Sequence, residues 1–142
     1  MGSIGFIDRD FITRMKADGV SYRVFNPMLP VVSLFMNNRD HRKITVIDGE
    51  IGFTGGYNLA DEYFNIMHPY GHWLDTGIQL RGEAVRSLTA IFLQNWNAIR
   101  GDDRDDRELR CYFPRTAYTA KEAGWCQPYA DSPLDEELTG EC

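Results

Sequence analysis

Residues 37–58 read NNRDHRKITVIDGEIGFTGGYN, and this stretch decides the local fold. Residues 43–47 are rich in β-branched side chains, residues 48–50 are Asp-Gly-Glu, and residues 51–54 form a second short run that favours extended structure. β-Branched residues favour strands, and Asp-Gly between two such runs is a strong signal for a tight turn. The stretch therefore predicts a β-hairpin.

The hairpin carries several groups that suit a phosphate. Residues i and i+2 of an extended chain point to the same face, so His41 and Lys43 are expected roughly 6–7 Å apart. Gly55-Gly56 allows a sharp turn whose N–H groups can face an anion, and Asn58 adds an amide donor. Only the imidazole can act as a nucleophile or as an acid and base near neutral pH.

Each feature also has a plain structural explanation. A histidine beside arginines is most often a solvated surface residue, and Gly-Gly after a strand is most often only a turn. The combined spacing, His41-x-Lys43-x4-Asp48 followed by Gly55-Gly56-x-Asn58, is harder to explain by chance than its parts. We therefore interpret the stretch as a site for a tetrahedral phosphate.

These residues resemble a known signature. HRKITVID at 41–48, followed by GGYN at 55–58, is similar to the HxKx4D motif of the phospholipase D superfamily. More narrowly, residues 39–63 and the segment HWLDTGIQLRGEAV at 72–85 resemble bacterial cardiolipin synthases. The resemblance covers about residues 6–96, and it implies an α/β fold, a phospholipase D-like repeat in which a mixed β-sheet is flanked by helices.

The resemblance also implies an activity and its residues. The reaction would transfer a phosphatidyl group between two phosphatidylglycerol molecules through a phosphohistidine intermediate, giving cardiolipin and glycerol without a metal or other cofactor. By this analogy His41 is the nucleophile, while Lys43 and Asn58 bind the phosphoryl oxygens. Asp48 helps to hold the hairpin, and Asp75 orients the motif histidine in the way that a triad aspartate does.

The superfamily usually places two such motifs in one chain, whereas this sequence contains one. We therefore expect residues 1–110 to be a first catalytic repeat, truncated at its N-terminus, and residues 111–142 to be a linker-like segment leading to a second repeat. The full-length enzyme would lie in the cell membrane and act on phosphatidylglycerol, with the second repeat as partner. The fragment itself is expected to be soluble, of cytoplasmic type, and inactive alone. Which motif's histidine attacks first is left open by the sequence.

Two other functions fit the same residues. A single-motif phosphodiesterase or nuclease would form its site as a homodimer that pairs two copies of His41, and a non-catalytic module would only bind anionic headgroups. The net charge of −6 argues against a nucleic-acid partner, because lysine and arginine contacts dominate such affinity. The three cysteines show no CxxC spacing, which gives no support to a zinc site or a disulfide framework.

The remaining pattern predicts the elements around the hairpin. A helix is expected over 6–17 with a C-terminal cap at Gly19, a short strand over 22–25, an apolar core segment over 28–36, and a further strand over 73–80. The clearest helix spans 83–99, and its apolar stripe comprises Val85, Leu88, Ile91, Phe92 and Trp96.

His68 and His72 have the spacing of two metal ligands on a helix. Pro69 and Gly71 lie between them and disfavour a helix there, so we interpret the segment as a loop near the mouth of the site.

Overall fold

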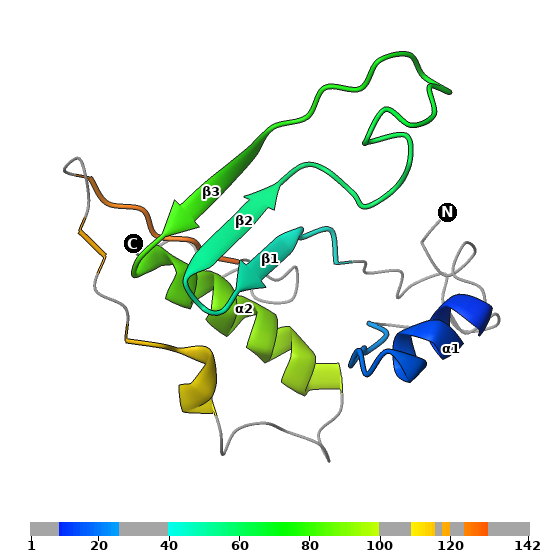
Figure 1. Cartoon of the computed structure of the whole chain (residues 1–142). Helices are drawn as coiled ribbons and strands as arrows, with labels where there is room; N and C mark the ends of the chain where they lie inside the picture. Colours follow the sequence, from blue (N-terminus) through cyan, green and yellow to red (C-terminus); the bar gives the residue numbers. More distant parts are fainter. Residues whose placement is uncertain (1–8, 26–39, 100–108, 116–117, 120–123, 131–142) are drawn as a thin grey trace, which may run out of the picture.

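The computed structural model describes residues 9–25, 40–99, 109–115, 118–119 and 124–130, and the structural statements below concern these residues. Strands β1 (Ile44–Ile47), β2 (Ile51–Gly55) and β3 (Gly77–Arg81) form a three-stranded sheet in the order β1-β2-β3. The other elements are α1 (Arg9–Ala17), α2 (Ala84–Ile99) and a short 3-10 helix, η2 (Leu109–Tyr112). Helix α2 packs across the sheet (Figure 1).

The described part of the chain is thus a mixed α/β unit. Both strand pairs are antiparallel, so the mixed sheet expected from the sequence is not seen among the described strands. The phospholipase D-like repeat stays a prediction, as does the division of the chain at residues 110 and 111. The apolar segment predicted at 28–36 lies outside the described residues.

The predicted hairpin is confirmed. Ile47 pairs with Ile51, and the register continues to Ile44 opposite Thr54. Between the strands, Asp48 and Gly49 have positive φ angles of 53° and 70°, a conformation that aspartate tolerates and glycine adopts freely. The turn is closed by a 3.0 Å hydrogen bond from the Glu50 N–H to the Ile47 carbonyl.

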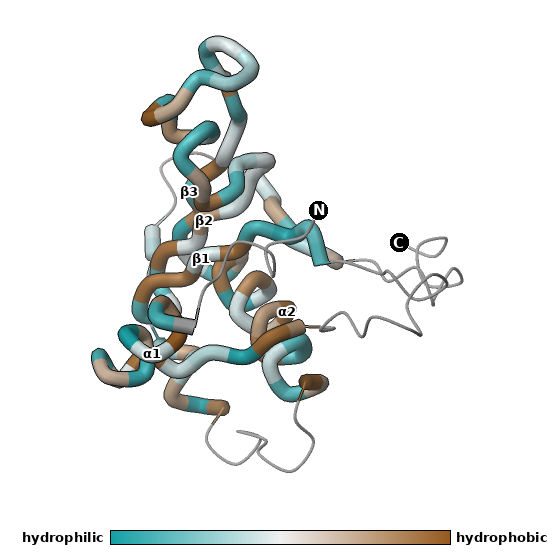
Figure 2. The backbone as a smooth tube through the Cα atoms, turned by 90° about the vertical axis from the view of Figure 1, so that its right-hand side faces the viewer, coloured by the Kyte–Doolittle hydropathy of each residue, from teal (hydrophilic) through white to brown (hydrophobic). Residues whose placement is uncertain are grey.

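The core lies between the sheet and α2. The register and the alternation of side chains place Val46, Gly52 and Leu80 on the face that meets the helix. Gly52 allows a close approach, because a Cβ atom there would lie 2.7 Å from Cδ1 of Leu88. Figure 2 shows the apolar segments of the strands gathered beside α2. The buried apolar side chains are Val85, Leu88, Ile91 and Leu93.

The apolar stripe predicted on α2 is confirmed at its N-terminal half and wrong at Phe92. Phe92 is 47% exposed and stacks on the half-buried Trp96, with ring centres 5.8 Å apart. The helix extends beyond the small sheet toward α1, so the strands do not cover this part of the stripe (Figure 1).

Helix α1 ends where the sequence predicts. Gly19 has a φ of 72°, its N–H donates to the Lys16 carbonyl, and the Val20 N–H donates to the Met15 carbonyl at 2.9 Å. This pair of bonds is the Schellman arrangement that glycine favours. Residues 6–8 of the predicted helix lie outside the described part.

The strand predicted over 22–25 is wrong, because these residues are not extended strand and pair with none of the described strands. Arg23 instead lies over the ring of Trp96, 4.2 Å from its centre, and donates a hydrogen bond to the Trp96 carbonyl. Contact with α2 therefore replaces pairing with the sheet. The strand predicted over 73–80 is confirmed from Gly77 onward, whereas residues 73–76 are irregular.

Candidate functional site

Four of the five site residues singled out by the sequence lie in segments at one end of the sheet. Because Ile44 pairs with Thr54 and Gly55 pairs with Gly77, the start of β1, the end of β2 and the start of β3 lie together. The segments that carry the candidate residues leave the sheet at this end (Figure 1). These residues are His41 and Lys43 before β1, Asn58 after β2 and Asp75 before β3.

Asp48 lies at the opposite end of the sheet, in the turn between β1 and β2. Within the described ranges its carboxylate makes no hydrogen bond and no ion pair. Its position agrees with a role in the hairpin and places it away from the other candidate residues.

The segment before β1 is anchored to α2 through Asp40. The Asp40 carboxylate accepts hydrogen bonds from the backbone N–H of Arg42 at 3.0 Å, from its Nε at 2.8 Å and from its Nη2 at 2.9 Å. The side-chain amide of Asn95, on α2, donates to the same carboxylate. These contacts hold the backbone next to His41 in place.

The charges of Asp40 and Arg42 neutralise each other. Partial burial alone would raise the pKa of Asp40, but the hydrogen bonds and the charge of Arg42, with the amide of Asn95, outweigh it and lower the pKa. The hydrogen bond to Asp40 raises the pKa of Arg42 further. Arg42 therefore stays charged and is engaged by Asp40, although it stands between the two candidate residues.

His41 is exposed and Lys43 is half-buried. The Lys43 ammonium donates a 2.6 Å hydrogen bond to the backbone carbonyl of His41. An ammonium has three N–H donors, and within the described ranges this is the hydrogen bond that the Lys43 ammonium makes, so two donors can serve an anion at this place. The structure thus brings the lysine charge to the main chain of His41. The placement of the two side chains on one face, roughly 6–7 Å apart, stays a prediction.

Asp75 is held at the junction of β2 and β3. Its carboxylate accepts hydrogen bonds from the Thr76 N–H at 2.8 Å and from the indole Nε1 of Trp73 at 3.2 Å. Its Oδ1 also lies against Gly56, where a Cβ atom would overlap it. No hydrogen bond joins Asp75 to His41 in the described part of the chain, so the orienting role of Asp75 stays a prediction.

Asn58 is half-buried just beyond the Gly55-Gly56 turn. Its side-chain amide makes no hydrogen bond with any described residue and can therefore donate to a ligand. The Gly56 N–H, which the sequence offered as an anion donor, instead donates to the Thr76 carbonyl at 3.1 Å. Among the described residues, the amide of Asn58 and the ammonium of Lys43 are thus two candidate donors at this end of the sheet.

The loop between β2 and β3 contains His68 and His72, as predicted. Their rings lie 6.4 Å apart, and no group of three or more potential metal ligands gathers anywhere in the described ranges. No described helix is long and apolar enough to cross a membrane. The role of Asn95 could not be recognised from sequence, because Asn95 acts on Asp40, far along the chain. The sequence singles out Gly56 as part of a turn, but not its contact with Asp75.

Part of the C-terminal segment packs onto the domain. Pro114 lies against Gly49 in the hairpin turn, and residues 126–130 help to line a cavity of about 280 Å³ between the sheet and α2. Arg42 lies at this cavity too, which places it on the helix side of the sheet. Cys111 and Cys126 are exposed free thiols.

Comparison with known proteins finds relatives over most of the chain. An uncharacterized protein of Streptococcus mutans is 43% identical over 132 residues, which are 93% of this chain and 28% of that protein. Cardiolipin synthase 2 of Staphylococcus epidermidis is 40% identical over 114 residues, and cardiolipin synthase of Staphylococcus aureus is 40% identical over 117 residues. Each of these two alignments covers 80% of this chain and 23% of the relative.

The chain therefore spans about a quarter of the length of the curated relatives it matches. No protein-family model and no solved structure matches it.

Proposed function

We infer that this chain, which is homologous over most of its length to bacterial cardiolipin synthases, is a catalytic repeat of the phospholipase D superfamily. The parent enzyme would transfer a phosphatidyl group from one phosphatidylglycerol to another. The proposal is supported by the strand register, which places the segment of His41 and Lys43, before β1, and the segment of Asn58, after β2, at the same end of the sheet. A nucleophile and two hydrogen-bond donors for an anion are what phosphoryl-group transfer through a covalent intermediate requires.

The reaction proceeds in two displacements. A ring nitrogen of His41 attacks the phosphorus of phosphatidylglycerol, a P–N bond forms, and the P–O bond to the glycerol headgroup breaks. The departing glycerol oxygen takes a proton from an acid supplied by a second repeat. A headgroup hydroxyl of another phosphatidylglycerol then attacks the phosphorus and loses its proton to the same group. The P–N bond breaks, which leaves cardiolipin, glycerol and free His41.

The other residues act on charge and orientation. The Lys43 ammonium and the Asn58 amide bind the phosphoryl oxygens, whose charge changes most in the transition state. Asp75, already oriented by Trp73 and Thr76, accepts the far ring N–H of His41 once the second repeat closes the site. Asp48 supports the hairpin that carries these groups, and the scheme needs no metal or other cofactor.

The test uses the full-length parent protein and vesicles that contain phosphatidylglycerol. His41→Ala is expected to abolish the release of both cardiolipin and glycerol, and to abolish the phosphohistidine that an alkaline quench traps in the wild type. Lys16→Ala, which removes an exposed lysine from α1, is the control and is expected to retain activity. Full transfer by the His41→Ala enzyme would disprove the nucleophile assignment.

The 142-residue chain alone is expected to be inactive, because its described residues include no second motif. Turnover by this chain that rises with the square of its concentration would instead support a homodimeric phosphodiesterase. Headgroup binding without turnover by the parent protein would support a non-catalytic module.

A further inference from the structure

The loop between β2 and β3 exposes an unusual group of apolar side chains. Residues 64–74 read FNIMHPYGHWL and contain no Asp, Glu, Lys or Arg, in a chain of which 25% is charged. Contiguous exposed apolar side chains usually mark an interaction surface. In residues 64–74 the exposed large apolar residues, with their exposed fractions, are Phe64 (57%), Ile66 (69%), Met67 (53%), Tyr70 (81%) and Leu74 (85%).

The loop is internally ordered rather than collapsed onto the domain. The side chain of Asn65 donates to the Trp73 carbonyl at 2.9 Å and accepts from the Trp73 N–H at 2.7 Å. The rings of Tyr63 and Trp73 meet edge to face with centres 4.9 Å apart, and the Ile66 N–H donates to the Asp61 carbonyl. These bonds satisfy backbone groups within the loop, which lowers the cost of moving it into an apolar medium.

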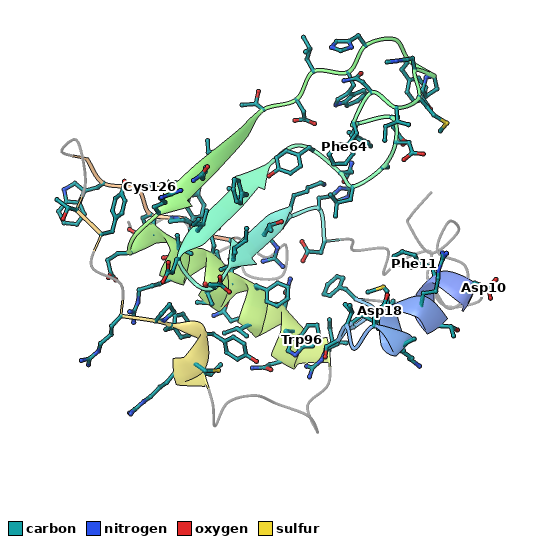
Figure 3. All side chains as sticks on the ribbon, in the orientation of Figure 1. Asp10, Phe11, Asp18, Phe64, Trp96 and Cys126 are labelled. Carbon is teal, nitrogen blue, oxygen red and sulfur yellow. The ribbon has the colours of Figure 1, made fainter. Side chains whose placement is uncertain are left out.

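The loop also lies at the end of the sheet that carries the candidate site. The pairing of Gly55 with Gly77 closes its base there, beside the segment of His41 and Lys43. Figure 3 shows the loop extending beyond the sheet with side chains pointing outward. A surface that binds the loop would therefore face the residues proposed to bind phosphate.

We propose that residues 64–74 are a membrane-docking loop that inserts Ile66, Met67 and Leu74 into the headgroup region of a phospholipid bilayer. The lipid nature of the substrate rests on the proposed function, whereas the docking rests on the loop itself. Three observations favour a bilayer as the binding partner. Residues 64–74 contain no Asp, Glu, Lys or Arg, and they include Tyr70 and Trp73, whose amphipathic rings suit the membrane interface. The loop also adjoins the end of the sheet that is proposed to bind phosphate.

The net charge of −6 opposes attraction to anionic lipid, so the binding energy comes from apolar burial. The loop is thus expected to bind neutral phosphatidylcholine vesicles, and raised salt is expected not to weaken this binding.

The test is sedimentation of the 142-residue chain with phosphatidylcholine vesicles, with and without added phosphatidylglycerol. The double variant Ile66→Ser and Met67→Ser is expected to lower the vesicle-bound fraction by about tenfold or more, because two apolar side chains no longer leave water. Leu74→Ser, on the other side of the loop, is expected to weaken binding on its own. The matched control is the double variant Val20→Ser and Val24→Ser, whose side chains are 48% and 44% exposed outside the loop. Circular dichroism identifies any variant that fails to fold.

Failure of the wild-type chain to bind vesicles, or equal binding by the wild-type and loop variants, overturns the proposal. If the loop variant without lipid has a lower sedimentation coefficient than the wild-type chain, the loop forms a contact between two copies of the chain. That result would also overturn the membrane-docking proposal. His41→Ala is expected to keep vesicle binding. The two proposals can fail separately. Cardiolipin synthesis by the parent enzyme carrying His41→Ala would disprove the proposed chemistry. Loss of vesicle binding in the loop variants would still support the membrane-docking loop.

Discussion

The carboxylate of Asp75 lies directly against the backbone of Gly56, in the space that a Cβ atom would occupy. The carboxylate cannot move away without cost, because the Thr76 N–H and the Trp73 indole both donate to it. The absence of a side chain at Gly56 and the position of Asp75 therefore depend on each other.

Gly56→Ala is expected to displace the Asp75 carboxylate and to lower the free energy of unfolding by about 1 kcal/mol, roughly the value of the lost hydrogen bond. In an Asp75→Ala background the same change is expected to cost little, since the clash is gone. Urea unfolding of the four proteins of this cycle measures the coupling. Gly124→Ala is the control, because a Cβ atom there meets nothing within 4 Å.

Gly52→Ala is expected to lower the free energy of unfolding more than Gly56→Ala does, because the new methyl group would lie 2.7 Å from Cδ1 of the buried Leu88. Overpacking of this kind costs about 1–3 kcal/mol. Leu88→Ala removes the obstacle, so the double variant is expected to lose less stability than the sum of the two single changes. Strict additivity in thermal or urea unfolding would contradict the packing of β2 on α2.

The Asp40 cluster is expected to make stability depend on pH. The pKa of Asp40 is lowered in the folded chain, so its contribution is fully present above about pH 5 and disappears as pH falls from about 4 through the lowered value. Asp40→Asn is therefore expected to destabilise the chain at pH 6.5 and to approach the wild type at pH 2. Unfolding midpoints at both pH values test this.

The control for Asp40 is Asp61→Asn, since the exposed Asp61 carboxylate has neither an ion pair nor a hydrogen bond with other described residues. This variant is expected to match the wild type at both pH values. An equal loss in the two variants at pH 6.5 would show that the effect is not specific to the link between Asp40, Arg42 and Asn95.

Asn65→Ala is expected to open the loop between β2 and β3. The change removes both hydrogen bonds to Trp73 and leaves alanine at a φ of 55°, which costs about 1–2 kcal/mol for a residue with a Cβ atom. Asn65→Gly removes the same bonds without that strain, so it is expected to lie between Asn65→Ala and the wild type. Hydrogen exchange at the Trp73 amide, which Asn65 protects, reports the opening. Identical exchange in all three proteins would refute the role of Asn65.

The local elements could be predicted from sequence because each depends on a few neighbouring residues. Asp48-Gly49 defines a turn between two β-branched runs, and Gly19 caps α1 by adopting a positive φ. The placement of the segments that carry Lys43 and Asn58 at the same end of the sheet also follows from local pattern, because a hairpin of known turn length brings its two ends together.

Other features could be seen only in the tertiary structure, because they are contacts between residues far apart in the sequence. No periodic pattern in the sequence links such residues. The bond from Asn95 to Asp40, the contact of Gly56 with Asp75 and the exposure of Phe92 all depend on where α2 and β3 come to rest against the hairpin. Local chain preferences select turns, strands and caps. The packing of the helix face against the sheet face decides which side chains of these elements meet. A sequence pattern does not contain the distances between side chains on different elements.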